Sequence, residues 1–224
     1  NGSDVLSAAV RIARAFTKKD LIAVCGYHGW HDWFIGTTSR DIGIPINVKK
    51  LTKTFQFNNI DSFNNVMLEN ENKFAAIIVE PETTVETNQA FLKYLRKFSR
   101  KNNILLIFDE VICGFRSTLG GASKKFNIMP DLGCFGKSMA NGYPISALVG
   151  KKKYMKLMDD VFVSGTFSGD IVSIAASIAT IKKLKKLNVI QKLEQLGEKL
   201  KMDLNNIISD NKLEQDIIFE GNNW

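Results

Sequence analysis

The sequence predicts an α/β fold in which helices cover both faces of a mostly parallel β-sheet. Short apolar segments alternate along the chain with segments of helical periodicity. Several of the short segments are apolar at every position, as in strands buried on both faces. Hydrophobic residues make up 45% and charged residues 24% of the 224 residues, a globular balance that excludes a disordered chain, a collagen and a coiled-coil rod.

The first helix is predicted over 4–17, where apolar residues recur at spacings of three and four. Three apolar segments are predicted as buried strands: 21–25, 74–79 and 104–108. Further strands are predicted at 132–135, 146–149 and 161–163. Helical patterns between and after them predict helices over 61–70, 89–101, 171–187 and 189–206.

The chain ends, the apolar runs and the cysteines bear on the class of protein. No apolar run approaches the roughly 18 residues of a membrane span, and no signal-peptide pattern is visible. The sequence begins with Asn1, and residues 217–221 resemble the start of a strand, so we expect a piece of a longer chain. Cys25, Cys113 and Cys134 are widely spaced, which predicts free thiols in a reducing cytoplasm.

The net charge of +7 comes largely from lysines, many of which lie within 151–156 and 182–186. Such clusters could form a nucleic-acid surface or simply the solvated face of a helix. We favour the solvated face, because no interleaving of basic and aromatic residues and no nucleic-acid motif accompanies the lysines.

Four junctions between predicted elements carry unusual residues, at 2–4, 26–29, 109–111 and 136–138. Ligands of open α/β sheets bind where strands end, so these junctions are the candidate site. An NTPase is one hypothesis for this site, because 104–110 resembles a Walker B strand and Gly136-Lys137-Ser138 resembles the end of a phosphate loop. A phosphate loop also needs Gly five residues before Gly136, where this chain has Asp131, and the two motifs are in the wrong order.

Two other kinds of site are disfavoured by spacing. His28 and His31, followed by Asp32, could bind a metal, but they are the only histidines, and a catalytic metal site usually needs three ligands. We therefore expect them to make local hydrogen bonds and packing contacts. The Gly- and Ser-containing stretch 165–169 lacks the spacing of a nucleophile elbow.

The four junctions together contain the parts of a pyridoxal-phosphate site. Lys137 can form a Schiff base with an aldehyde, and Asp109 can keep a pyridine nitrogen protonated. Tyr27 can stack on the ring. Gly2 and Ser3, at the start of a helix, can bind a phosphate through backbone N–H groups and the helix dipole. Each residue alone is a weak signal, whereas the combination is much stronger.

Several stretches resemble the class III aminotransferases, and within them the branch similar to glutamate-1-semialdehyde aminomutase. The matching stretches are 1–5, 9–17, 26–29, 79–81, FDEVICGFR at 108–116, 130–132, GKSMANGYP at 136–144 and GTFSG at 165–169. The resemblance runs from Asn1 to about Leu204. The pair of motifs Asp-Glu-Val and Gly-Lys, with 28 residues from Asp109 to Lys137, is highly specific.

The resemblance implies a role for each matched residue. Lys137 would form the Schiff base and move the proton, and Asp109 would pair with the pyridine nitrogen. Val111 and Tyr27 would contact opposite faces of the ring. Residue alternation along a strand also predicts that Val111 and Asp109 face the same way. His28 is expected in the same cofactor site.

The resemblance also implies phosphate ligands and a partner subunit. Gly2 and Ser3 would hold the phosphate, and Thr166 would reach the phosphate of the neighbouring subunit, which implies a homodimer. Glu80 would begin the loop beside the cofactor. The family often has a Gly shortly after this Glu-Pro pair, whereas Glu82-Thr83-Thr84-Val85 has none.

The implied fold is the type I aminotransferase fold, whose large domain has a mostly parallel seven-stranded sheet between helices. Residues 1–208 would form that domain without its N-terminal segment, and 209–224 would begin a small C-terminal domain. The expected cofactor is pyridoxal 5′-phosphate. No metal, nucleic acid or membrane partner is expected, and the location is expected to be cytoplasmic.

The implied activity is transfer of a primary amine between an amino donor and an aldehyde or ketone. Glutamate-1-semialdehyde 2,1-aminomutase chemistry, in which donor and acceptor carbons belong to one molecule, is the alternative. A non-catalytic protein on the same fold is less favoured, because Lys137 and Asp109 are both present. The 224 residues alone are expected to be inactive, and the substrate is left open.

Overall fold

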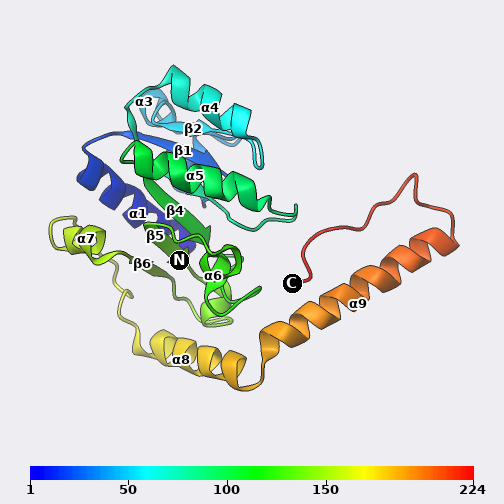
Figure 1. Cartoon of the computed structure of the whole chain (residues 1–224). Helices are drawn as coiled ribbons and strands as arrows, with labels where there is room; N and C mark the ends of the chain where they lie inside the picture. The colour runs from blue at the N-terminus through cyan, green and yellow to red at the C-terminus, as the bar shows by residue number, and fades with distance from the viewer.

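The computed structural model describes residues 1–224, which form a six-stranded sheet between helices (Figure 1). The strands are β1 (Leu21–Cys25), β2 (Thr52–Thr54), β3 (Phe74–Val79), β4 (Leu105–Glu110), β5 (Leu132–Phe135) and β6 (Ala147–Gly150). Their order in the sheet is β2-β1-β3-β4-β5-β6. All neighbours pair in parallel except β6, which is antiparallel to β5. The predicted α/β fold with a mostly parallel sheet is therefore confirmed.

The helices and helical turns occupy the connections between strands and the C-terminal part of the chain. They are α1 (Gly2–Thr17), α2 (Asp32–Ile35), α3 (Ile46–Lys49), α4 (Ile60–Glu69), α5 (Gln89–Lys101), α6 (Gly121–Phe126), η1 (Lys137–Met139), α7 (Lys152–Met155), η2 (Lys156–Asp159), α8 (Ile171–Lys186) and α9 (Val189–Asp210). Five of them match the helices predicted from periodicity, and α9 extends further than predicted. The short helices carried no periodic signal, because a single turn is too short to show one.

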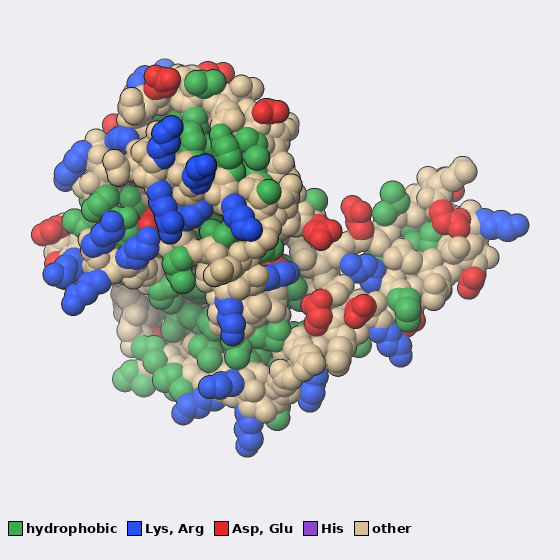
Figure 2. Space-filling model, in the orientation of Figure 1, with side chains coloured by type: hydrophobic (Ala, Val, Ile, Leu, Met, Phe, Trp, Pro, Cys, Tyr) green, Lys and Arg blue, Asp and Glu red, His purple; other side chains and the backbone are tan.

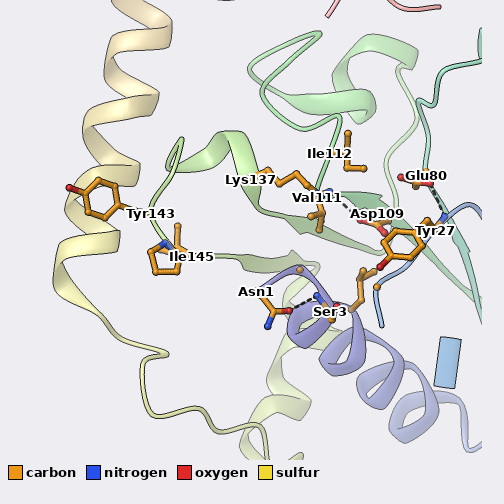
Figure 3. A pocket seen from close by; sticks show the side chains of 14 residues that line it. Asn1, Ser3, Tyr27, Glu80, Asp109, Val111, Ile112, Lys137, Tyr143 and Ile145 are labelled. Atoms are coloured by element: carbon orange, nitrogen blue, oxygen red, sulfur yellow. Dashed lines mark hydrogen bonds between the residues drawn. The ribbon is translucent and has the colours of Figure 1, made fainter. Parts of the chain in front are cut away.

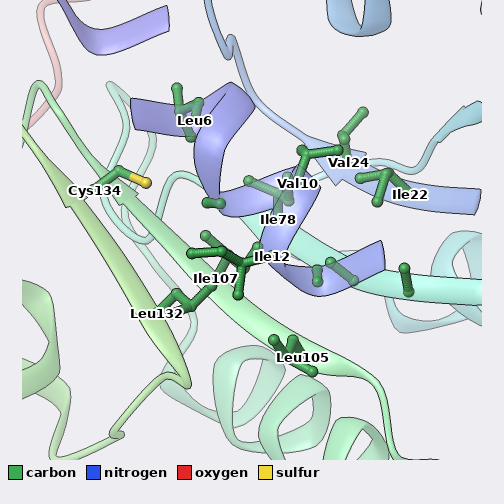
Figure 4. Packing of buried hydrophobic residues seen from close by; sticks show 14 of the residues in the cluster. Leu6, Val10, Ile12, Ile22, Val24, Ile78, Leu105, Ile107, Leu132 and Cys134 are labelled. Carbon is green, nitrogen blue, oxygen red and sulfur yellow. The ribbon is translucent and has the colours of Figure 1, made fainter. Parts of the chain in front are cut away.

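Two hydrophobic clusters fill the space between the sheet and its helices. Side chains of α1 and α7 pack on one face, and side chains of α4, α5 and α6 pack on the other. In β4, Leu105 and Ile107 join the α1 cluster, whereas Leu106 and Phe108 join the α5 cluster. Figure 4 shows the α1 side of this core, with α1 lying across the strands. The continuously apolar strands are thus buried on both faces, as the sequence predicts.

Local sequence fixes the start of α1, the helix that begins at the candidate site. The Asn1 side chain accepts a hydrogen bond from the Ser3 backbone N–H, and the Asp4 side chain pairs with the Asn1 backbone nitrogen, which forms a capping box. The buried face of the helix is made of small and branched residues such as Ala9, Ile12 and Ala13. These small side chains allow the helix to lie close to the sheet.

Helices α8 and α9 lead away from the sheet (Figure 1). Apolar side chains are open to solvent in the region of α8 (Figure 2), among them Ile171, Val172 and Ile178. Lys182, Lys183, Lys185 and Lys186 lie exposed on the same helix. No helix has the length and apolar character that a membrane crossing requires.

Three details of the predicted fold are wrong. Residues 161–163 form no strand: Val161 is buried but Phe162 is 81% exposed, and the segment has no neighbouring strand. The sheet has six strands instead of seven, and it includes β2, which the sequence did not predict. β2 is a Thr-Lys-Thr edge strand without an apolar run to reveal it. Residues 217–221 also form no strand.

Candidate active site

A cavity of about 360 Å³ lies at the carboxyl ends of the central strands, beside the start of α1 (Figure 3). It is lined by Asn1, Gly2, Ser3, Leu6, Tyr27, Gly29, Glu80, Asp109, Val111, Ile112, Lys137, Tyr143, Pro144 and Ile145. Seven of the nine residues predicted for the site are among them. The other two are His28, which lies directly behind the cavity wall, and Thr166, which is exposed elsewhere.

Asp109 is buried near the end of β4 and is held in place from two sides. Its Oδ2 lies 2.8 Å from His28 Nδ1, and its Oδ1 accepts a hydrogen bond from the Val111 backbone N–H at 3.1 Å. His28 is fully buried, and its ring packs against Trp33 and Phe34. The second ring nitrogen of His28 is buried without a partner. The geometry therefore presents a fixed carboxylate to the cavity, with an imidazole behind it.

Lys137 is separated from the end of β5 by Gly136 alone and begins η1. Its φ angle of 36° is in the left-handed region, which is unusual for a residue with a side chain. Backbone strain of this kind costs roughly 1–3 kcal/mol and is found most often where function requires a fixed geometry. The strand and the turn together bring the lysine side chain into the cavity that contains Asp109 (Figure 3).

Glu80 follows β3 and holds the loop that carries Tyr27. The Tyr27 backbone N–H donates to Glu80 Oε2 at 2.8 Å. Gly26, with φ of 110°, makes the close turn before it, and a Cβ there would lie 2.6 Å from the same carboxylate oxygen. Burial raises the pKa of Glu80, while the hydrogen bond from Tyr27 opposes that shift. The Tyr27 ring is left partly exposed at the cavity.

The start of α1 forms a close-packed corner of the cavity. The Ser3 hydroxyl accepts a hydrogen bond from the Trp30 backbone N–H at 3.3 Å. A Cβ on Gly2 would lie 2.7 Å from Val111 Cγ1, so glycine is needed for this approach. Gly29, with φ of 93°, likewise passes directly over Ser3. The positive end of the dipole of the 16-residue α1 lies at this corner and makes it suitable for an anion, which would replace the Asn1 side chain as the acceptor for the Ser3 backbone N–H.

The contacts of the two histidines and the composition of one cavity wall differ from what the sequence predicted. His31 Nδ1 lies 2.6 Å from Ser7 Oγ, and His28 Nδ1 lies 2.8 Å from Asp109 Oδ2. Both histidines therefore make hydrogen bonds, but with residues distant in sequence instead of the local partners that the sequence predicted. The cavity wall formed by Tyr143, Pro144 and Ile145 was not predicted as part of the site. The sequence signal for this wall is the Asn-Gly-Tyr-Pro segment at 141–144, which begins four residues after the predicted lysine.

The comparisons with known proteins agree with this geometry. The model of the family described as "Aminotransferase class-III" matches residues 1–222 of this chain. The 3-aminobutyryl-CoA aminotransferase of Cloacimonas acidaminovorans is 36% identical, with the match covering 100% of this chain and 54% of that protein. Glutamate-1-semialdehyde 2,1-aminomutase of Archaeoglobus fulgidus is also 36% identical, over 96% of this chain and 56% of the relative.

Solved structures give the same result. The FumI protein of Sphingopyxis sp. MTA144, in its PLP internal aldimine form, is 30% identical with a TM-score of 0.88, covering 94% of this chain and 52% of that one. An omega-transaminase from Sphaerobacter thermophilus has a TM-score of 0.86 at 27% identity, covering 94% and 54%. The chain spans about half the length of the relatives that it matches. By the family match and the sequence identities, this chain belongs to the class III aminotransferases.

Proposed function

We propose that the protein is a pyridoxal-phosphate-dependent transaminase that moves a primary amine between an amino donor and an aldehyde or ketone. One observation carries the proposal: a single cavity is lined by Lys137, Asp109, Tyr27 and the start of α1. Family membership and the PLP-containing structural neighbour support pyridoxal phosphate as the cofactor.

The residues of the cavity fit this cofactor. A buried carboxylate backed by an imidazole suits a pyridine nitrogen, and a helix N-terminus flanked by glycines suits a phosphate. When bound, pyridoxal phosphate supplies an electron-withdrawing ring that stabilises negative charge on the substrate carbon. Lys137 would hold the cofactor through its Nζ atom, and Asp109, Tyr27, Ser3 and Gly2 would orient it.

Side chains of this chain would move the protons, orient the ring and exclude water. Lys137 Nζ would accept a proton from the substrate carbon and return it, acting as a general base and then as a general acid. Asp109 would hold a proton on the ring nitrogen, and His28 would keep that carboxylate oriented. Tyr27 would cover the ring and exclude water, with its loop held by Glu80.

A homodimer is part of the proposal. Thr166 does not line the cavity of its own chain, so its predicted contact with a phosphate requires a second copy. The exposed apolar side chains of Phe167, Ile171 and Val172 next to it support a surface that a second copy would cover. We also propose that residues 1–208 form the large domain and that 209–224 begin the small one.

An intramolecular aminomutase is the second candidate. It is supported by the relative from Archaeoglobus fulgidus, which is as similar in sequence as the aminotransferase relative. The residues discussed above would serve both reactions. The two candidates differ in whether a separate amino acceptor is consumed, and assay of the full-length protein with and without an added 2-oxo acid separates them.

The decisive experiment is covalent labelling of Lys137. Full-length protein incubated with pyridoxal phosphate should be yellow, and reduction with borohydride should fix the cofactor on Lys137, as read by peptide mass spectrometry. Lys137→Ala should lose the label. The exposed Lys124 provides a matched control, since Lys124→Ala should keep the label. A label on any other lysine would show that the site is assigned wrongly.

A further inference from the structure

Two glutamates are buried behind the wall of the cavity, where they are not needed to hold the cofactor. Glu82 is 2% exposed and Glu110 is 1% exposed. Glu82 lies two residues after Glu80, in the loop that lacks the expected glycine, and Glu110 is the last residue of β4. Glutamate is almost never fully buried unless it is paired, so both side chains require an explanation.

Glu82 connects three segments that are distant in sequence. Its Oε2 accepts a hydrogen bond from Ser117 Oγ at 2.5 Å, and its Oε1 forms an ion pair with Lys125 of α6. We call these three residues the Glu82 cluster. Beside it, Glu110 Oε2 accepts a hydrogen bond from the Ala122 backbone N–H at 2.6 Å. These contacts tie the segment after β3 to the segment after β4 and to α6.

The two tied segments each form part of the cavity wall. The segment after β3 contributes Glu80, and the segment after β4 contributes Val111 and Ile112. Pairing between β3 and β4 ends at Val79 and Phe108, before either segment begins. Beyond that point the relative position of the two segments depends on side-chain contacts, and in the Glu82 cluster a buried carboxylate is paired with the partly exposed Lys125.

We propose that Glu82 is a positioning residue, which through Ser117 and Lys125 sets the distance between Glu80 and Ile112 and thereby the fit of the amine substrate. The inference rests on the proposed transaminase function. Two of the groups proposed to hold the cofactor have supports of their own, because Asp109 is fixed by His28 and Ser3 belongs to α1, whereas the Tyr27 loop depends on Glu80. Loss of the Glu82 cluster should therefore weaken substrate binding more than cofactor binding.

The experiment compares full-length Glu82→Gln, Lys125→Met, the double variant and Lys125→Arg with the wild type. Glu82→Gln keeps the shape and the contact with Ser117 but removes the ion pair. Cofactor affinity is read by absorbance titration with pyridoxal phosphate. Substrate affinity is read from the loss of the cofactor absorbance band in single turnovers with l-alanine, l-glutamate or 3-aminobutyrate, whichever reacts with the wild type. Lys124→Met, an exposed neighbour without an ion pair, is the control.

Glu82→Gln and Lys125→Met should each raise the half-saturating donor concentration by at least about tenfold, within the roughly 100-fold that a 1 Å misplacement can cost. The cofactor dissociation constant and the limiting rate should change less than about twofold, which is the pattern of lost substrate binding. The double variant should resemble the single variants, because one ion pair is lost in each case. Lys125→Arg should restore most of the affinity.

Two results would overturn the inference. The first is an unchanged donor affinity in both single variants. The second is a joint fall in cofactor affinity, rate and thermal stability, which would mean that the Glu82 cluster only supports the fold. Failure of the proposed function is distinct, because it would appear in the wild type as no cofactor band and no reaction with any of the three donors.

Discussion

Asp131 anchors the start of β5, the strand that leads to Lys137, and its replacement tests how strongly that strand is held. Asp131 Oδ2 lies 2.8 Å from Arg96 Nη1 and accepts a hydrogen bond from the Leu106 backbone N–H at 2.9 Å. Its Oδ1 pairs with Lys151 at 2.6 Å. The change Asp131→Asn removes the charge with little change in shape and leaves Arg96 without a counter-ion.

The expected loss follows from the exposure of the three side chains. Those of Asp131 and Arg96 are only 3% and 9% exposed, and breaking a buried ion pair by removing one partner costs about 3–5 kcal/mol. Lys151 is 40% exposed, so its pair contributes at most about 1 kcal/mol. Asn can still accept the hydrogen bond from Leu106. We therefore expect the free energy of unfolding to fall by about 3 kcal/mol at neutral pH.

The loss of unfolding free energy caused by Asp131→Asn should depend on pH. Burial alone would raise the pKa of Asp131, but the hydrogen bonds from Lys151 and Leu106, together with Arg96, lower it below its usual value of 3.8. A carboxylate with a lowered pKa in the folded state stabilises the protein above the unfolded-state pKa. That stabilisation is lost as the pH falls through the folded-state value. The difference between wild type and variant should therefore be complete above about pH 5 and shrink below pH 4.

Urea unfolding of the full-length protein, followed by circular dichroism between pH 3 and pH 8, measures this difference. Asp203→Asn, which changes an exposed acid on α9 that forms no ion pair, is the control and should change stability by less than about 0.5 kcal/mol. A loss below about 1 kcal/mol for Asp131→Asn, or a loss that is the same at pH 3 and pH 7, would refute the reasoning.

Three further outcomes are expected of the full-length protein. Asp109→Asn should lower the steady-state transamination rate by orders of magnitude while the melting temperature changes little, and near-native turnover would show that the carboxylate is only structural. Burial raises the pKa of Glu110 to about 7. The wild type should therefore lose stability as pH rises from 4.5 to 7, and thermal unfolding of Glu110→Gln should show a smaller decline. Thr166→Val should weaken cofactor retention and dimerisation together in sedimentation experiments, and a stable, active monomer would contradict the cross-subunit contact.

Most of the fold could be predicted because its signals are local. The continuous apolar runs of β1, β3 and β4 report burial on both faces, and the period of α5 gives both of its ends correctly. The strand β2 is short, polar and at the sheet edge, so no local pattern marks it. Residues 161–163 show the reverse error: three apolar residues suffice for a strand pattern, but pairing depends on a neighbour that the sequence does not reveal.

The site was predictable only where it lies at strand ends and at the start of α1. Asp109 lies near the end of β4, and Glu80 and Lys137 come shortly after β3 and β5, so parallel pairing brings the three residues to one edge of the sheet. The roles of His28 behind Asp109 and of Glu82 behind Glu80 depend on contacts between distant segments, which no spacing in the sequence encodes. Burial of polar side chains reveals such contacts only once the chain is folded.

The alternation of β4 connects the hydrophobic core to the chemistry of the site. Leu105 and Ile107 face α1, so Asp109 faces the same side and enters the cavity, while Glu110 faces α6. A shift of one residue would turn Asp109 toward α6 and place a longer carboxylate in the cavity. It would also turn Leu105 and Ile107 out of one core cluster and into the other. The apolar residues that stabilise the sheet therefore also determine which of two adjacent carboxylates faces Lys137.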